Sequence, residues 1–415
     1  MPTPSLLIVP ARFKTGKLYS QIPTSGAGDF TVTRNTAARR FDSAGLVASV
    51  ASGIPRLDYY TSGGVTGCPA LLVEPAATNL ALQSAGFQVS GTWAPDNATI
   101  TTGTTSAFTA PDGSTDADLL TDDATLGRHR VSQGSLPFTS GTTYAFSIFV
   151  KKNSSGRFLL INANTAIGAR AALNLDTLAI TNIDGSGASV ENYGNGWYRF
   201  SIRGTAPATT AAGTIFVQMQ DAATDTTYIG NGSSFYLWGA QLETGSVATS
   251  YIPTTAASGS RSADVISVSG AVSGSIGQTE GTIYWEGAIY RYDRVFFALS
   301  SGTSTTQAVR LQTTGAGLLQ GIAISGSVQG NPQTSGAVTL GQFYKVAFAY
   351  KENDFVLYVN GVLQQSDPSG TLPTNLNSVY FCNSNGTEIT DQRCRAVALY
   401  TTRLTNAELA TLTTP

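Results

Sequence analysis

Residues 143–150 read Thr-Tyr-Ala-Phe-Ser-Ile-Phe-Val, and this stretch decides the fold class. Bulky apolar residues alternate in it with small or polar ones, which is typical of a β-strand with one buried face. Similar stretches recur at residues 157–162, 197–202, 214–219 and 234–239. Strands at this spacing predict a β-sandwich of about 170 residues.

A second series of strands follows a segment near residues 255–277 that is rich in Ser, Gly and Ala. Such a composition favours a linker. The new series begins at residues 281–287 and continues through residues 343–350. Asn360 and Gly361 then stand between two alternating apolar stretches. They predict a tight hairpin, because both turn positions need a positive φ.

Helical periodicity is nearly absent before the end of the chain. Residues 405–412 form the one expected helix, because Thr405 and Glu408 have the spacing of a capping box. We therefore expect an all-β protein of two β-sandwiches preceded by a region of short strands. The expected parts are an N-terminal arm at residues 1–83, a first sandwich at 84–262, a linker at 263–280 and a second sandwich at 281–415.

Composition excludes several classes of function. Charged residues are 12% of the 415 residues, and 24 Lys and Arg face 26 Asp and Glu. Nucleic-acid binding and a polybasic membrane contact both need a basic face, so neither is expected. No apolar run approaches the about 20 residues of a membrane span. The start of the chain lacks a basic leader, so we expect synthesis in a cytosol.

Catalytic and metal-binding patterns are also missing. One histidine excludes a histidine-rich metal site, and three cysteines are too few for a disulfide scaffold. Whether Cys382 and Cys394 pair stays open. Glycan cleavage needs two carboxylates around a bond, and Glu280 with Glu286 is the closest pair on one predicted strand. No acid lies between them, and the run around Trp285 fits a core strand better. We therefore expect no enzyme and no cofactor.

A few aromatic residues could contact a sugar. Trp93 precedes a Pro-Asp turn near the edge of the first sandwich, where it could form a stacking platform. Tyr290, Tyr292 and Asp293 combine aromatic faces with hydrogen-bonding groups. Sugar binding needs that mixture, but core and interface roles need it too. These four residues are the candidates for ligand binding.

A series of motifs gives a more specific indication. FKTGKLYS at residues 13–20, GIPRLDY at 53–59 and GCPALLVEP at 67–75 are followed by WGAQLE at 238–243 and RLTNAEL at 403–409. The series resembles tailed-bacteriophage head fibre or head spike proteins and related tail-fibre proteins. The resemblance implies a carbohydrate-binding-module-like jelly roll and a C-terminal concanavalin A-like lectin domain.

The resemblance also implies a place and partners for the chain. It implies a virion surface protein, commonly a homotrimer, whose N-terminal arm attaches to phage capsid or tail proteins and whose sandwiches meet surface or mucus glycans. The attachment residues that it suggests are Arg34, Arg56, Asp58, Glu74 and Asn79. One position departs from the family, because Ala77 stands where an arginine is usual. Any ion pair of that arginine is lost here.

Three hypotheses follow from the sequence. The first is a virion structural protein whose lectin-like domains adhere to glycans. The second is a virion-associated glycan hydrolase whose carboxylates come from separate strands, which a sequence does not reveal. The third is an architectural spacer that binds no sugar, since a lectin-like fold alone does not prove sugar binding.

Overall fold

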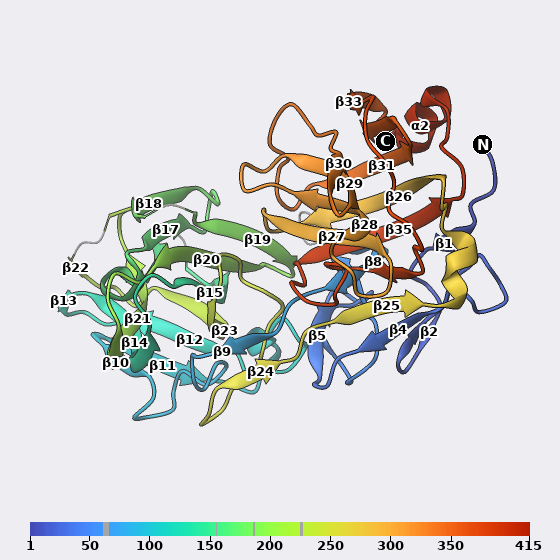
Figure 1. Cartoon of the computed structure of the whole chain (residues 1–415). Coiled ribbons are helices and arrows are strands. Elements are labelled where there is room, and N and C mark those ends of the chain that lie inside the picture. The colour runs from blue at the N-terminus through green and yellow to red at the C-terminus, as the bar shows by residue number, and fades with distance from the viewer. Residues whose placement is uncertain (61–65, 155, 186, 225–226) are drawn as a thin grey trace.

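The computed structural model describes residues 1–415 apart from 61–65, 155, 186 and 225–226. The described residues are nearly all β, which confirms the predicted fold class. Their larger sheets form two β-sandwiches that lie side by side (Figure 1). The α-helices of the described residues are α1 (Asn164–Ile167) and α2 (Asn406–Thr413), and neither is long and apolar enough to cross a membrane.

The first sandwich, a jelly roll, consists of two six-stranded antiparallel sheets. One sheet has the order β10 (Ala94–Asp96), β14 (His129–Phe138), β21 (Thr210–Gln220), β16 (Phe158–Asn162), β17 (Arg170–Asn174) and β18 (Ile180–Asp184). The other has the order β11 (Ala98–Thr102), β12 (Asp118–Asp122), β23 (Ser234–Thr244), β15 (Thr143–Lys152), β20 (Trp197–Thr205) and β19 (Ser189–Gly194). The five strands predicted in this region are all present.

The core of the jelly roll follows from the alternation that predicted its strands. Phe146 and Ile148 of β15, Leu159 of β16 and Val217 of β21 are fully buried between the two sheets. The outer face of the second sheet is also covered. Phe149 on that face packs in a separate aromatic cluster with residues from other segments. A sheet that is buried on both faces places its outer side against the rest of the molecule.

The second sandwich joins an eight-stranded sheet to a nine-stranded sheet. The first has the order β33 (Val362–Asp367), β32 (Asp354–Val359), β31 (Phe343–Lys351), β26 (Glu280–Ile289), β35 (Gln392–Tyr400), β8 (Thr66–Val73) and β7 (Arg56–Tyr60), with β1 (Leu6–Ile8) also paired to β35. The second has the order β2 (Phe13–Lys14), β3 (Lys17–Leu18), β4 (Phe30–Thr33), β25 (Val265–Ser269), β34 (Ser378–Tyr380), β27 (Arg294–Ser300), β28 (Gln307–Thr313), β29 (Leu319–Ser325) and β30 (Ser327–Gly330).

The N-terminal residues are part of this second sandwich. Residues 1–83 were expected as a separate arm, but β1, β7 and β8 belong to the eight-stranded sheet and β2, β3 and β4 to the nine-stranded sheet (Figure 1). The expected linker at residues 263–280 likewise contains β25 and the 3-10 helix η2 (Ala271–Ser275). The physical reason is that strand partners lie hundreds of residues away, so no local pattern reveals them. Leu6, for example, is opposite Leu399.

Short strand pairs complete the architecture. They are β9 (Ala77–Asn79) with β24 (Gly259–Arg261), β5 (Ala38–Phe41) with β6 (Val47–Val50) and β13 (Leu126–Gly127) with β22 (Tyr228–Ile229), and a further 3-10 helix is η1 (Ser106–Phe108). In the pair of β9 and β24, Ala77 is opposite Arg261. The chain therefore leaves the second sandwich through β9 and returns to it through β24, and these two strands are paired.

Candidate functional site

The five residues that the resemblance assigns to virion attachment are all buried. They are Arg34, Arg56, Asp58, Glu74 and Asn79. Arg56 donates a hydrogen bond to Glu74 across 2.6 Å and forms an ion pair with Asp264. Arg34 pairs with the same Asp264 at 2.9 Å. These side chains hold together segments that are distant in the sequence, and in this conformation they offer no surface to another protein.

The buried ion cluster consists of Arg34, Arg56, Glu74, Arg261 and Asp264. Burial alone would raise the pKa of Glu74, but Arg261 and Arg56 together hold that pKa well below its usual value. Burial would lower the pKa of Arg56, and Asp264 and Glu74 raise it instead. Ionised partners in such a closed arrangement stabilise one another, and because all five side chains are buried their charges are not exposed to a ligand.

Asn79 and Asp58 have similar internal roles. The Asn79 amide donates to the carbonyls of Ala240 and Ile252, at 3.0 and 2.9 Å, and so ties β9 to the jelly roll. Asp58 accepts a hydrogen bond from the Phe41 amide at 2.7 Å and pairs with Arg393. Both residues organise the junction between the two sandwiches.

Trp93 is a core residue rather than an exposed platform for a sugar. Only 2% of it is exposed, and its ring lies 4.8 Å from that of Phe87, centre to centre. Its indole nitrogen donates to the carbonyls of Leu82 and Gln83. A buried tryptophan whose only donor is satisfied has no face left for a ligand.

Tyr292 and Asp293 lie apart from Tyr290. The Tyr292 hydroxyl donates to the Val338 carbonyl at 2.6 Å. Asp293 is exposed in a turn at a φ of 56°. Neither residue is among the described residues that line the cavity and the hollows identified below. Of the predicted sugar-binding residues, Tyr290 alone reaches the junction.

Tyr290 belongs to an aromatic and charged cluster at that junction. The guanidinium of Arg393 lies 5.0 Å from the ring centre of Tyr60 and 4.9 Å from that of Tyr290. Arg393 also donates to the Tyr290 hydroxyl and pairs with Asp58. Burial raises the pKa of Tyr290, so its phenol is neutral at physiological pH and keeps a proton to donate.

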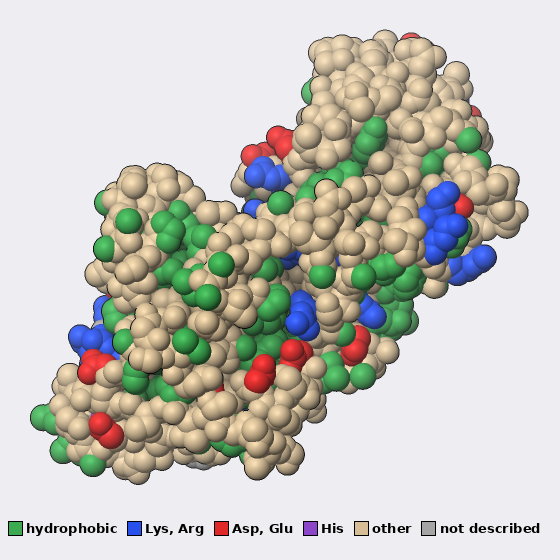
Figure 2. Space-filling view, turned by 90° about the horizontal axis from the view of Figure 1, so that it is seen from below, with side chains coloured by type: hydrophobic (Ala, Val, Ile, Leu, Met, Phe, Trp, Pro, Cys, Tyr) green, Lys and Arg blue, Asp and Glu red, His purple; other side chains and the backbone are tan. Residues whose placement is uncertain are grey.

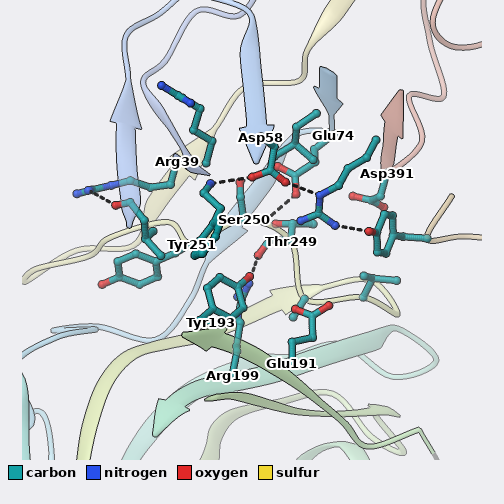
Figure 3. A pocket seen from close by; sticks show the side chains of 18 of the residues that line it. Arg39, Asp58, Glu74, Glu191, Tyr193, Arg199, Thr249, Ser250, Tyr251 and Asp391 are labelled. Atoms are coloured by element: carbon teal, nitrogen blue, oxygen red, sulfur yellow. Dashed lines mark hydrogen bonds and ion pairs between the residues drawn. The ribbon is translucent and has the colours of Figure 1, made fainter. Parts of the chain in front are cut away.

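A small polar cavity of about 60 Å³ lies between the two sandwiches (Figure 3). Asp58 and Glu74 border it on one side, and Glu191 and Tyr193 border it on the other. Its size and polar walls suit a few ordered water molecules rather than a saccharide. A larger ligand needs the open space beside it.

Two larger hollows continue from this cavity and together form the junction groove. The first, of about 280 Å³, is lined by Glu191, Arg199, Arg203, Tyr290, Leu340 and Gly341, among others. The second, of about 640 Å³, shares Glu191, Tyr290, Leu340 and Gly341 and adds Tyr60, Tyr198, Phe343 and Arg395. Strands β19 and β20 of the jelly roll form one wall. The second sandwich supplies the other.

The groove combines aromatic faces with free polar groups. Tyr60, Tyr198 and Phe343 are half-buried, so part of each residue is exposed to solvent. Glu191 is half-buried as well, and no described residue hydrogen-bonds its carboxylate or forms an ion pair with it. The guanidinium of Arg395 lies 3.7 Å from the ring centre of Phe343. Aromatic faces beside unsatisfied hydrogen-bonding groups can hold a ligand that has both apolar faces and hydroxyls.

Part of the second sandwich is similar to a known superfamily. Residues 283–410 match the model of the concanavalin A-like lectin/glucanases superfamily. This range runs from β26 to α2 and so covers less than a third of the chain. A search of curated proteins gave no significant match.

Several solved structures are similar to parts of the chain. One is the CBM40 of a Ruminococcus gnavus IT-sialidase bound to alpha2,3 sialyllactose, at 17% identity over 34% of this chain and 84% of that chain, with a TM-score of 0.29. Another is domain 4 of a GH43 extracellular arabinanase from Geobacillus stearothermophilus in complex with arabinotriose, at 14% identity over 36% and 73%, with a TM-score of 0.30. Mouse laminin alpha1 domains LG4-5 match at 12% identity over 63% and 84%, with a TM-score of 0.24.

Sequence reasoning missed most of the groove. Glu191, Arg199 and Arg203 lie on predicted or flanking strands of the jelly roll, and Arg395 lies on β35. Each looks like an ordinary charged residue on the polar face of a strand. The only local signal was the density of aromatic residues around Tyr290, because the groove forms where two distant parts of the chain meet.

Proposed function

We propose that the chain binds glycans in the junction groove. The observation that carries this proposal is the groove itself, where Tyr60, Tyr198 and Phe343 offer aromatic faces beside Glu191 and Arg395. Sugars present apolar C–H faces and a rim of hydroxyls, which this combination of side chains complements. The lectin/glucanases superfamily match of residues 283–410 supports the same class of ligand.

Binding without cleavage is the second part of the proposal. A glycan hydrolase needs two carboxylates on either side of the scissile bond, separated by about 5 to 9.5 Å. Glu191 is the one carboxylate among the described residues that line the two hollows. Glu280 pairs with Lys351 at 3.4 Å, and Glu286 accepts a hydrogen bond from Tyr284. Neither glutamate is among the described lining residues of the groove.

A glycan array followed by titration of the best ligand tests the proposal. Phe343→Ala removes a groove face and is expected to weaken affinity about tenfold, since one well-placed stacking contact contributes about 1 kcal/mol or more. Phe13→Ala makes the same change at an exposed site on β2 and should leave affinity unchanged. Absence of any glycan ligand for the folded chain would contradict the proposal. Release of reducing ends from the ligand would show a hydrolase.

We also propose that the chain is a bacteriophage virion surface protein, either a head fibre or a tail fibre. The motifs at residues 13–20, 53–59 and 67–75 support this finer assignment, because they resemble the start of such proteins. Immunogold labelling of purified particles tests it, and sedimentation velocity tests the expected homotrimer. Particles that lack the chain would refute the assignment and leave the glycan-binding proposal standing.

A further inference from the structure

The charges of the junction groove are unequal. Three arginines, Arg199, Arg203 and Arg395, and one carboxylate, Glu191, are among the described residues that line its two hollows. The chain as a whole has a net charge of −2. Figure 2 shows one face of the molecule, on which charged side chains are scattered rather than gathered in one patch. The lining of the groove therefore has a net positive charge, although the net charge of the whole chain is negative.

The first of these arginines is offset by the glutamate. Arg199 of β20 and Glu191 of β19 are directly opposite each other in the antiparallel pair. Arg199 donates to the Thr249 carbonyl at 2.6 Å and to the Ser147 hydroxyl at 3.0 Å, which are both neutral acceptors. Glu191 is the one acidic residue of the neighbouring strand β19, so by charge count it offsets Arg199 and leaves Arg203 and Arg395 as the excess.

The other two arginines have no such partner. No described residue hydrogen-bonds Arg203 or forms an ion pair with it, and the same holds for Arg395. Elsewhere, half-exposed arginines such as Arg130 and Arg403 pair with carboxylates, at 3.1 Å to Asp96 and 2.9 Å to Asp354. Arg203 is exposed, whereas the Nε of Arg395 is buried without a hydrogen-bond partner.

Each of the two free guanidiniums lies close to another part of the groove. Arg395 lies on the ring of Phe343, which leaves the edge of its guanidinium fork free. Arg203 is exposed and lies beside Gly187, where the missing side chain leaves it room, since a Cβ there would come within 2.1 Å of its Nε. The contact with Phe343 restricts Arg395, which therefore loses less entropy when it binds an anion, and the fork of either guanidinium matches the two oxygens of a carboxylate.

We infer that the junction groove selects anionic oligosaccharides, with Arg203 and Arg395 as the two anion-binding residues. This inference rests on the proposed glycan binding and names the class of glycan. The two arginines line different hollows, which share Glu191 and Tyr290, so a ligand that reaches both is an oligomer with more than one acidic sugar. The aromatic faces of Tyr198 and Phe343 pack on its rings.

Two ligands with the same backbone but different charge show whether the groove recognises the charge of a glycan or its shape. Hexagalacturonate and its methyl ester have the same backbone and stereochemistry, but the ester is neutral. An array of acidic and neutral glycans identifies the preferred backbone, and titration calorimetry then compares the charged and neutral forms of that backbone. We expect the charged form to bind at least tenfold more tightly and to lose affinity as salt rises from 50 to 500 mM.

Variants assign the effect to the two arginines. Arg203→Gln and Arg395→Gln should each weaken binding of the anionic ligand about tenfold and weaken binding of the neutral form much less. Glu191→Gln should strengthen it, because a repulsive charge is removed. Arg12→Gln removes an exposed arginine that is not among the described lining residues of the groove and should have no effect. Circular dichroism of each variant verifies that it is folded.

The possible outcomes distinguish failure of the anion selectivity from failure of the proposed glycan binding. Equal binding of charged and neutral glycans would overturn the selection of anions and leave glycan binding intact. Anion binding that neither arginine variant weakens would overturn the assigned residues. A folded chain that binds no glycan on the array would overturn the proposed function together with the inference.

Discussion

Arg56 illustrates why a resemblance between sequences does not locate a docking surface. Its side chain is completely buried and joins Glu74 and Asp264, which are 190 residues apart, in one cluster. A motif that contains such residues contributes to the folding of the chain. Removing one member leaves the others charged and buried, which costs far more than the loss of a surface ion pair.

Arg56→Ala is therefore expected to lower the free energy of unfolding by about 3–5 kcal/mol, because Glu74 and Asp264 lose their shared counter-ion. Urea denaturation followed by tryptophan fluorescence measures the change. Arg12→Ala removes an exposed arginine and should change the free energy by less than about 0.5 kcal/mol. A loss below about 1 kcal/mol in Arg56→Ala would contradict the role given to the cluster.

Asp391 is a buried carboxylate whose negative charge has few stabilising partners. It borders the small junction cavity, and neither of its oxygens accepts a hydrogen bond from a described residue, although Arg291 forms an ion pair with it. Burial raises its pKa from 3.8 to about 6, against the lowering effect of Arg291. The folded chain therefore holds a proton at pH values where the unfolded chain has released it.

The sign of the resulting pH dependence follows from linkage. Below about pH 4 the carboxyl group is protonated in both states, and above about pH 6 it is ionised in both. Between these values, rising pH favours the unfolded chain. The stability of the native protein, relative to that of Asp391→Asn, should fall by on the order of 2 kcal/mol from pH 4 to pH 7. Denaturation at several pH values measures this difference, and a flat difference curve would be incompatible with it.

At the scale of single elements, local sequence rules were reliable. The predicted hairpin occurs between β32 and β33, with Asn360 at a φ of 49° and Gly361 at 81°. The capping box also forms at the start of α2. The Thr405 hydroxyl accepts from the Glu408 amide, and the Glu408 carboxylate accepts from the Thr405 amide at 2.8 Å. These features were predictable because all their contacts lie within a few residues.

Thr405→Ala tests that cap. The variant leaves the Glu408 amide without its side-chain acceptor and should lower the free energy of unfolding by about 1 kcal/mol. Thr411→Ala is the matched control in the same helix, where Ala is the better helix former and stability should be unchanged or slightly higher. Thermal melts of both variants compare them, and equal shifts would show that the cap is without effect.

Pairing between distant elements was not predictable. The alternation in residues 143–150 indicates a strand but carries no information on its neighbours, and the same holds for β1 and β8 in the other sandwich. The groove depends on such pairing, because Tyr60 of β7 and Arg395 of β35 meet Glu191 of β19 only after both sheets have formed. Tyr290 was found by its local composition, whereas its partners had no local signal.

At the scale of the whole molecule, one sandwich is inserted into the other. Both jelly-roll sheets consist entirely of strands from β10 to β23, whereas the second sandwich takes strands from before and after that range. Leu6, Phe30 and Leu71 from the early segment are fully buried in its core beside residues such as Phe348. The region that matches the lectin/glucanases superfamily is thus only part of a folding unit.

This topology predicts which fragments fold alone. Residues 77–261 contain every strand of the jelly roll and should melt cooperatively, whereas residues 263–415 lack six strands of their sandwich and should not. Ala77 and Arg261 are opposite each other in one strand pair, so a linker of about four Gly and Ser residues can join residue 76 to residue 262. That shortened chain should regain a cooperative melt, because it restores both sheets. Circular dichroism and nuclear magnetic resonance spectra of the three fragments measure this, and autonomous folding of residues 263–415 would show that the early strands are dispensable.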